Sequence, residues 1–177
     1  MAEALSHVLA AFVIFTLLSW RIEWLERKWV VVAMVGSILP DLNRFGLILD
    51  SDTIEAVLGI PFSWGAIHTL GGVLLLSAIG ALIFAERRNQ LIGFVMLLGG
   101  GVSHLLIDAV KAWGDGYNGV YLYPFSWWRN PTPGWYVSAD RWVVVITLLL
   151  ALMVFLIDVS TKNPEWIQRV RNFLWHD

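Results

Sequence analysis

The sequence predicts an all-α fold: a polytopic transmembrane bundle of about five helices, with an interfacial loop and a C-terminal amphipathic helix. Hydrophobic residues make up 58% of the 177 residues and charged residues only 15%, whereas soluble domains average about 45–50% and about 25%. The apolar residues form long runs without the alternation of barrel strands, and only helices and closed barrels satisfy the backbone inside lipid. This composition excludes an ordinary soluble enzyme, a disordered chain and a nucleic-acid-binding protein. The absence of cysteine excludes disulfides and thiolate metal sites.

The apolar residues form five runs that differ in length. They are residues 4–20, 29–40, 66–85, 91–110 and 142–157. A helix needs about 20 residues to cross the hydrocarbon core, so the third and fourth runs are long enough and the first and fifth are slightly short. The second run is long enough to cross the bilayer only if its helix also includes residues 24–28, and otherwise it ends inside the bilayer. We interpret the first run as a retained helix and not a signal peptide, because it carries Glu3 and no basic region precedes it.

Lysine and arginine residues are divided unequally between the two sides of the predicted bundle. With the N-terminus outside, eight of the 12 lie in inner segments and four in outer segments. The positive-inside rule therefore predicts a protein of the cytoplasmic membrane with its N-terminus outside and its C-terminus in the cytoplasm. We expect one transmembrane domain over residues 1–160, followed by a tail over residues 161–177 that forms an amphipathic helix on the inner leaflet.

Two connections between the apolar runs carry signs of structure. Asp52 and Glu55 have the spacing of a capping box, which predicts a short helix ending near Leu58. Apolar neighbours on the N-terminal side of this helix indicate that the connection lies in the membrane interface. The second connection, residues 111–141, holds six aromatic residues between positions 117 and 128, so we expect it to pack on the bundle or on the membrane.

Five ionisable residues lie within or at the ends of the apolar runs. They are His7, Asp41, His68, His104 and Asp108. Because successive spans alternate in direction, all five fall at the same depth, on the outer face of the predicted bundle. His104 and Asp108 are four residues apart and therefore share one face of a helix. Ionisable groups in membrane segments are costly, so their convergence predicts a functional site.

Imidazole and carboxylate groups are suitable ligands for Zn, Mn, Fe or Ni. We expect the five side chains to hold a divalent transition metal, zinc with manganese as the alternative, either as one ion or as two ions that share a carboxylate. A metal pair can activate water and clamp both oxygens of a phosphoryl displacement. The candidate catalytic residues are Asp41, His104 and Asp108, and Asp115 is a weaker ligand candidate. The remaining polar residues considered are read as solvated, loop or cap residues: His176, Asp50, Asp52 and Asp140.

The order and spacing of these residues resemble the YdjM-like family of membrane-bound metal-dependent hydrolases. The resemblance covers roughly residues 1–130. It rests on Ser6-His7, Leu39-Pro40-Asp41-Leu42-Asn43, residues 63–69 with His68, residues 100–108 with His104 and Asp108, Trp113-Gly114 and Tyr123-Pro124-Phe125. It implies a metal-dependent hydrolase of a prokaryotic inner membrane.

The chain departs from that family's pattern at two places. Asn43 stands where the pattern has a second aspartate, and Ser63-Trp64 stands where it has His-Arg. A carboxylate, an imidazole and a basic group are therefore missing. Three alternatives follow: a site with one metal, a site for a different metal, or a family member without hydrolytic activity.

The leading hypothesis is a membrane-embedded hydrolase that acts on a phosphate ester or lipid-like substrate at the outer interface. The alternatives are a non-enzymatic membrane protein that transports an ion or metal, and a bundle whose polar groups only pair with one another. The expected partners are the lipid bilayer and a small-molecule or lipid substrate, with no nucleic acid, and the oligomeric state stays open. Distances among the five side chains distinguish the hypotheses, because metal ligands approach one point to about 2.0–2.2 Å.

Overall fold

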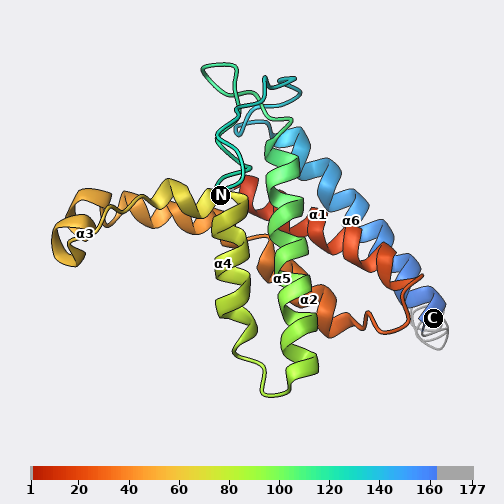
Figure 1. The fold of residues 1–177 in the computed structure, drawn as a ribbon. Coiled ribbons are helices and arrows are strands. Elements are labelled where there is room, and N and C mark those ends of the chain that lie inside the picture. Colours follow the sequence, from red (N-terminus) through yellow and green to blue (C-terminus); the bar gives the residue numbers. More distant parts are fainter. Residues whose placement is uncertain (1, 163–177) are drawn as a thin grey trace.

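The computed structural model describes residues 2–162, and helices dominate that part of the chain. The elements are α1 (Ala2–Ser19), α2 (Arg27–Gly36), η1 (Leu39–Leu47), α3 (Ser51–Leu58), η2 (Trp64–His68), α4 (Leu70–Ala81), α5 (Arg87–Asp108) and α6 (Arg141–Lys162), where η marks a 3₁₀ helix. α5 packs against α2 and α4, and α1 packs against α2 and α6. Figure 1 shows η1, α3 and η2 projecting sideways from these helices as an arm, residues 39–68.

The all-α prediction is confirmed over the described residues, but the count of five spans is not. Three helical stretches are long and apolar enough to cross a membrane: Arg27–Leu47, Arg87–Asp108 and Arg141–Lys162. Glu3–Ser19 and Leu70–Ala81 are apolar but shorter. The third run loses its first residues to η2 because the Thr69 side chain accepts a hydrogen bond from Gly72 N and caps α4 there. The predicted orientation stays a prediction.

Glycines on α5 and α2 allow the helices around α5 to approach closely. A Cβ added at Gly100 would meet the Ala33 carbonyl of α2, and one added at Gly101 would meet the Val73 side chain of α4. A Cβ at Gly36 would meet the backbone of Leu97. Small residues serve this purpose at helix interfaces in membranes, where close packing replaces the hydrophobic effect as the driving force.

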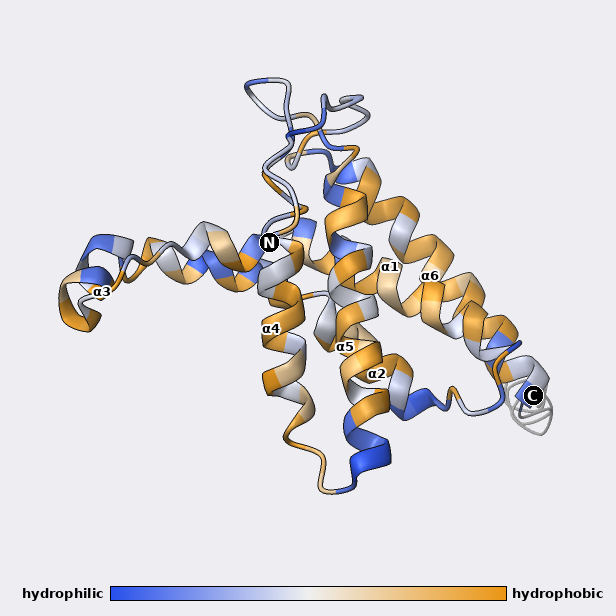
Figure 2. Cartoon of the chain, viewed as in Figure 1, coloured by the Kyte–Doolittle hydropathy of each residue, from blue (hydrophilic) through white to orange (hydrophobic). Residues whose placement is uncertain are grey.

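The arm contains the short helix that the sequence predicted, although a different residue caps it. Asp50, and not Asp52, is the N-cap of α3, because its extended backbone lets the carboxylate accept from Thr53 N at 2.8 Å. The helix ends at Gly59, which has a φ of +67°. Leu47 and Ile48 are 88% and 85% exposed, and Figure 2 shows hydrophobic and hydrophilic residues interspersed along the arm.

The connection between α5 and α6 packs on the bundle at the end where the arm leaves it (Figure 1). Leu70 N donates to Tyr121 O at 2.7 Å and Gly71 N donates to Tyr123 O at 2.8 Å, which attaches the connection to the start of α4. The predicted packing of this aromatic segment is therefore observed. The predicted domain boundary at residue 160 falls in the last turn of α6. The amphipathic helix expected beyond it, and His176, lie outside the described residues.

Asp158 joins three helices at the end of the bundle opposite the arm. Its buried carboxylate accepts from Trp20 Nε1 at 3.0 Å, from Arg27 Nη2 at 2.9 Å and from Lys162 Nζ at 2.7 Å. The end of α1, the start of α2 and the end of α6 are thereby held together. The sequence analysis did not single out this residue, because its partners come from distant parts of the chain.

Replacing Asp158 with alanine is expected to destabilise the protein by about 1–3 kcal/mol. The variant leaves three donors without their charged acceptor, and each hydrogen bond to a charged group stabilises a fold by about 1.5–3 kcal/mol. Arg27 and Lys162 are exposed, so solvent reduces the stability lost when their bonds to Asp158 are removed. Thermal unfolding of the detergent-solubilised protein measures the change. Asp52→Ala, on the exposed arm, is the matched control, and equal stability of the two variants would contradict the role of Asp158.

Candidate metal centre

Three imidazoles converge on the carboxylate of Asp108, the last residue of α5. Nε2 of His7, from α1, lies 3.3 Å from Oδ1. Nε2 of His68, at the end of η2, lies 3.1 Å from Oδ2, and Nε2 of His104, one turn earlier on α5, lies 3.5 Å from it. His7, His104 and Asp108 are buried, whereas the His68 side chain is 12% exposed. The predicted convergence of these four residues is therefore present in the structure.

Backbone carbonyls orient two of the rings. His104 Nδ1 lies 2.7 Å from Ser37 O, and His68 Nδ1 lies 3.3 Å from Pro40 O. A carbonyl oxygen can only accept, so Nδ1 donates in both rings and Nε2 of the neutral ring presents its lone pair toward Asp108. His7 stacks on His104 with the ring centroids 3.7 Å apart. The rings are thus held in place by contacts that leave the Nε2 atoms facing the carboxylate.

Asp41 completes the set from η1. Its Oδ1 accepts from Arg44 Nε at 3.0 Å, while Oδ2 is buried without a hydrogen-bond partner. Asp41, His68 and His104 form one group whose ligand atoms lie within 4.8 Å of one another, and His7, His104 and Asp108 form a second. The second group is fully buried and could hold a metal ion. Because His104 Nε2 has one lone pair, it can ligate only one ion at a time.

Several of the ligand atoms in this cluster lack the partners that buried polar atoms normally have. They are both ring nitrogens of His7, Nε2 of His104, Oδ1 of Asp108 and Oδ2 of Asp41. Buried side-chain polar atoms are in the large majority hydrogen-bonded, so five such atoms within one cluster require an explanation. A cation placed among them would satisfy the lone pairs that they direct toward one another.

The chain's similarity to known proteins can now be set beside this geometry. A family model described as YdjM inner membrane protein matches residues 1–174. The chain belongs to the YdjM inner membrane protein family. The match extends well beyond the motifs of residues 1–130, and it identifies this YdjM-family protein as an inner, or cytoplasmic, membrane protein. No curated protein and no solved structure gives a significant match.

Asp115, the weaker ligand candidate, lies outside the cluster of this YdjM-family protein. Its exposed carboxylate accepts from Arg129 Nη2 at 2.6 Å, and this hydrogen bond holds the pKa of Asp115 below its ordinary value. Asp115 lies in a turn between Gly114 and Gly116 and pairs with Arg129 of the connection, so proximity in sequence to Asp108 was misleading. Asp140 accepts from Val137 N at 2.8 Å in the segment before α6, as expected of a loop residue.

Sequence analysis did not identify Glu3 and Lys111, which contact the cluster. Lys111 Nζ lies 2.6 Å from Glu3 Oε1 and 3.4 Å from Asp108 Oδ1, and Ser138 Oγ donates to the same Glu3 oxygen at 3.0 Å. Arg44 Nη2 lies 3.4 Å from the other Glu3 oxygen. Glu3 therefore fixes the first turn of α1, one turn before His7, to two side chains of the connection and one of the arm. The i,i+4 spacing of Glu3 and His7 was the available signal.

Replacing Glu3 with glutamine is expected to lower metal affinity by about tenfold. The substitution keeps the side-chain shape but removes the charge that binds Lys111. The first turn of α1, which positions His7, is then held less firmly. Changes to groups that orient metal ligands typically lower metal affinity or activity 10–100-fold. Competition with a chelator of known zinc affinity measures the effect. Glu23→Gln, exposed between α1 and α2 and outside the pocket lining, is the control, and equal affinities would show that Glu3 does not position His7.

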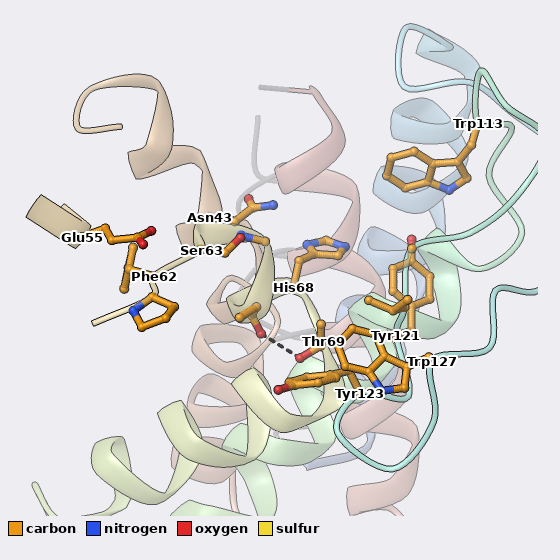
Figure 3. A pocket seen from close by; sticks show the side chains of 15 residues that line it. Asn43, Glu55, Phe62, Ser63, His68, Thr69, Trp113, Tyr121, Tyr123 and Trp127 are labelled. Carbon is orange, nitrogen blue, oxygen red and sulfur yellow. Dashed lines mark hydrogen bonds between the residues drawn. The ribbon is translucent and has the colours of Figure 1, made fainter. Parts of the chain in front are cut away.

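A pocket of about 630 Å³ lies between the arm and the connection that follows α5. Figure 3 shows His68 in it, with Asn43 and Ser63 of the arm on one side and Trp113 and Tyr121 of the connection on the other. Of the five candidate ligands, only His68 lines the pocket. The pocket therefore gives access to His68, which is the only partly exposed histidine of the cluster.

Proposed function

We propose that this YdjM-family protein is a membrane-embedded, metal-dependent hydrolase that acts on a phosphate ester or lipid-like substrate at the outer interface. The observation that carries the proposal is the set of unpartnered, buried ligand atoms around Asp108. Neutral imidazoles that direct lone pairs at a carboxylate are destabilising unless a cation lies between them. A divalent transition metal supplies that cation, and imidazole with carboxylate suits zinc, with manganese as the alternative.

The four residues that converge in the structure are the proposed ligands: His7, His68, His104 and Asp108. Bound there, a divalent metal would lower the pKa of water and polarise the oxygen of an ester. Asp41 is the proposed general base, because Arg44 holds one carboxylate oxygen and the other is free and buried beside His68 and His104. If Asp41 also ligates, the group of Asp41, His68 and His104 could hold a second ion, although His104 can serve only one of the two.

The pocket beside His68 favours a hydrolase over a purely structural cluster. Polar groups that only pair with one another need no cavity, and here a 630 Å³ pocket reaches the most exposed of the histidines. Enzyme sites of this kind combine a concave, mostly apolar pocket with a few convergent polar groups. A transport pathway would need to continue from the cluster toward the opposite end of the bundle, where Asp158 is fully engaged with Trp20, Arg27 and Lys162.

Elemental analysis and an activity panel test the proposal together. Full-length protein purified in mild detergent at neutral pH, incubated with zinc and desalted, is expected to retain at least one equivalent of metal. Phosphate monoesters, phosphodiesters and phospholipids are then offered, and hydrolysis is expected to stop with chelator and to return with zinc. Protein that retains no stoichiometric transition metal would overturn the metal site, and metal-loaded protein that hydrolyses none of the panel would overturn the hydrolase.

A further inference from the structure

The walls of the pocket beside His68 are aromatic and carry no positive charge. Its lining includes the rings Phe62, Trp113, Tyr121, Tyr123 and Trp127 and no lysine or arginine. In Figure 3 Tyr123 and Trp127 lie together on the wall below His68, and their ring centroids are 4.8 Å apart. The carboxylate of Glu55 also lines the pocket, so this surface favours hydrocarbon and disfavours a highly charged anion.

The arm and the connection, which form the two rims of this pocket, also expose large apolar side chains outside its lining. On the arm they are Leu47, Ile48 and Val57, and on the connection they are Phe125 and Trp128. Exposed apolar residues in such numbers mark a surface that contacts lipid or a partner, and aromatic residues are enriched where a protein meets the membrane interface. Because the helices from which both rims extend are lipid-facing, we place the rims in the interface, with the pocket mouth between them.

The charges around the cluster leave little capacity for an anionic substrate. Asp108 and Asp41 together neutralise one divalent ion. Lys111 is buried and paired with Glu3 at 2.6 Å, and its ammonium lies 4.2 Å from the centre of the Trp113 ring, so its charge is already balanced. Arg44 pairs with Asp41 and Glu3 and does not line the pocket. A dianionic group brought to His68 would therefore remain uncompensated in a poorly hydrated site.

From these observations we infer that the pocket binds the hydrocarbon chain of a membrane amphiphile and presents a monoanionic phosphodiester to the cluster. This inference rests on the proposed hydrolase and narrows its substrate to a diester of a chain-bearing alcohol that enters from the lipid. In the reaction one water is consumed. Its oxygen bonds to phosphorus, one phosphorus–oxygen ester bond breaks, and a proton from the water passes through Asp41 to the leaving alcohol.

Photo-crosslinking of the full-length protein in lipid nanodiscs tests this binding mode. The probe is a lysophosphatidylcholine with a diazirine near the end of its chain. Peptides from residues 61–69 and 119–127 are expected to carry most of the label. Unlabelled lysophosphatidylcholine is expected to compete at least about tenfold better than glycerophosphocholine, which has the same head and no chain, because each buried methylene adds affinity. It is also expected to compete better than lysophosphatidic acid, a phosphomonoester that carries a larger negative charge.

Two variants with the same substitution localise the effect. Ala66 lines the pocket and is exposed, so Ala66→Trp is expected to fill the space and lower labelling at least about fivefold. Ala56→Trp, exposed on α3 and outside the pocket lining, is expected to leave labelling unchanged. Label spread evenly over α5 and α6, equal competition by the chainless head, or stronger competition by lysophosphatidic acid would overturn the inference. Chain binding needs no metal, so labelling that persists in a His104→Ala variant separates this result from failure of the metal site.

Discussion

Asp108→Ala is expected to abolish stoichiometric metal binding and, with it, hydrolysis. Asp108 is the one residue that all three imidazoles face, at 3.1–3.5 Å from their Nε2 atoms. Its loss removes the negative charge that makes a cation favourable there and leaves three buried rings without their common partner. We expect metal affinity to fall more than about 100-fold, beyond the 10–100-fold typical of a group that only orients a ligand. Elemental analysis after desalting measures the effect.

The matched control for this variant is Asp115→Ala. Asp115 lies seven positions further along the chain, and its exposed carboxylate pairs with Arg129 away from the cluster. It is expected to keep the metal content of the parent protein. His104→Ala is expected to resemble Asp108→Ala, because His104 belongs to both groups of candidate ligands. Full metal content in Asp108→Ala would show that the ion binds at a site that does not include Asp108.

The convergence of the site could be predicted from the sequence because it depends on a simple property of the bundle. Helices that alternate in direction bring the end of one beside the start of the next, so His7, His68 and Asp108 had to lie at one depth. Alternation does not fix the rotation of each helix about its axis. The sequence therefore could not tell that Asp108 would be the common partner, or that Asp41 would offer one free oxygen.

Contacts between distant residues were beyond sequence reasoning. The pair formed by Glu3 and Lys111 joins residues 108 positions apart, and the contact between Trp20 and Asp158 spans 138. No local sequence pattern predicts such pairs, because each residue alone resembles an ordinary residue near the end of a helix or in a loop. The cap of α3 was missed for a local reason: Asp50 and Asp52 are both good capping residues, and only the backbone conformation selects Asp50.

The two departures from the family pattern have roles in the arm and pocket. Asn43 lines the pocket. Trp64 donates from Nε1 to Leu49 O at 2.7 Å and its ring packs against Phe45 and Phe62, which braces the arm. The residues that replace a carboxylate and a basic group therefore add no charge to the approach to His68. This agrees with a site that has fewer charged residues than the family pattern and that binds a substrate of low charge.

Gly100→Val is expected to destabilise the protein by about 3 kcal/mol and to lower its metal affinity as well. The added side chain would meet the Ala33 carbonyl, and Ser37 N lies 2.8 Å from the position of its Cβ. Neither is a flexible side-chain end that could turn away, so α2 must move from α5, and overpacking of this kind typically costs 1–3 kcal/mol or more. The same movement would break the hydrogen bond between His104 Nδ1 and Ser37 O, which orients His104 toward Asp108.

Thermal unfolding followed by circular dichroism, together with metal content, tests whether helix packing and the site are coupled in this way. Gly114→Val is the matched control, because a Cβ at Gly114 meets nothing within 4 Å. If Gly100→Val lowers stability while the remaining folded protein keeps full zinc affinity, the Ser37 carbonyl is dispensable for the orientation of His104. If stability and zinc affinity both fall, the close approach of α2 and α5 also determines the geometry of the site. Gly100 then both allows the two helices to pack and keeps the His104 imidazole in the orientation that metal binding requires.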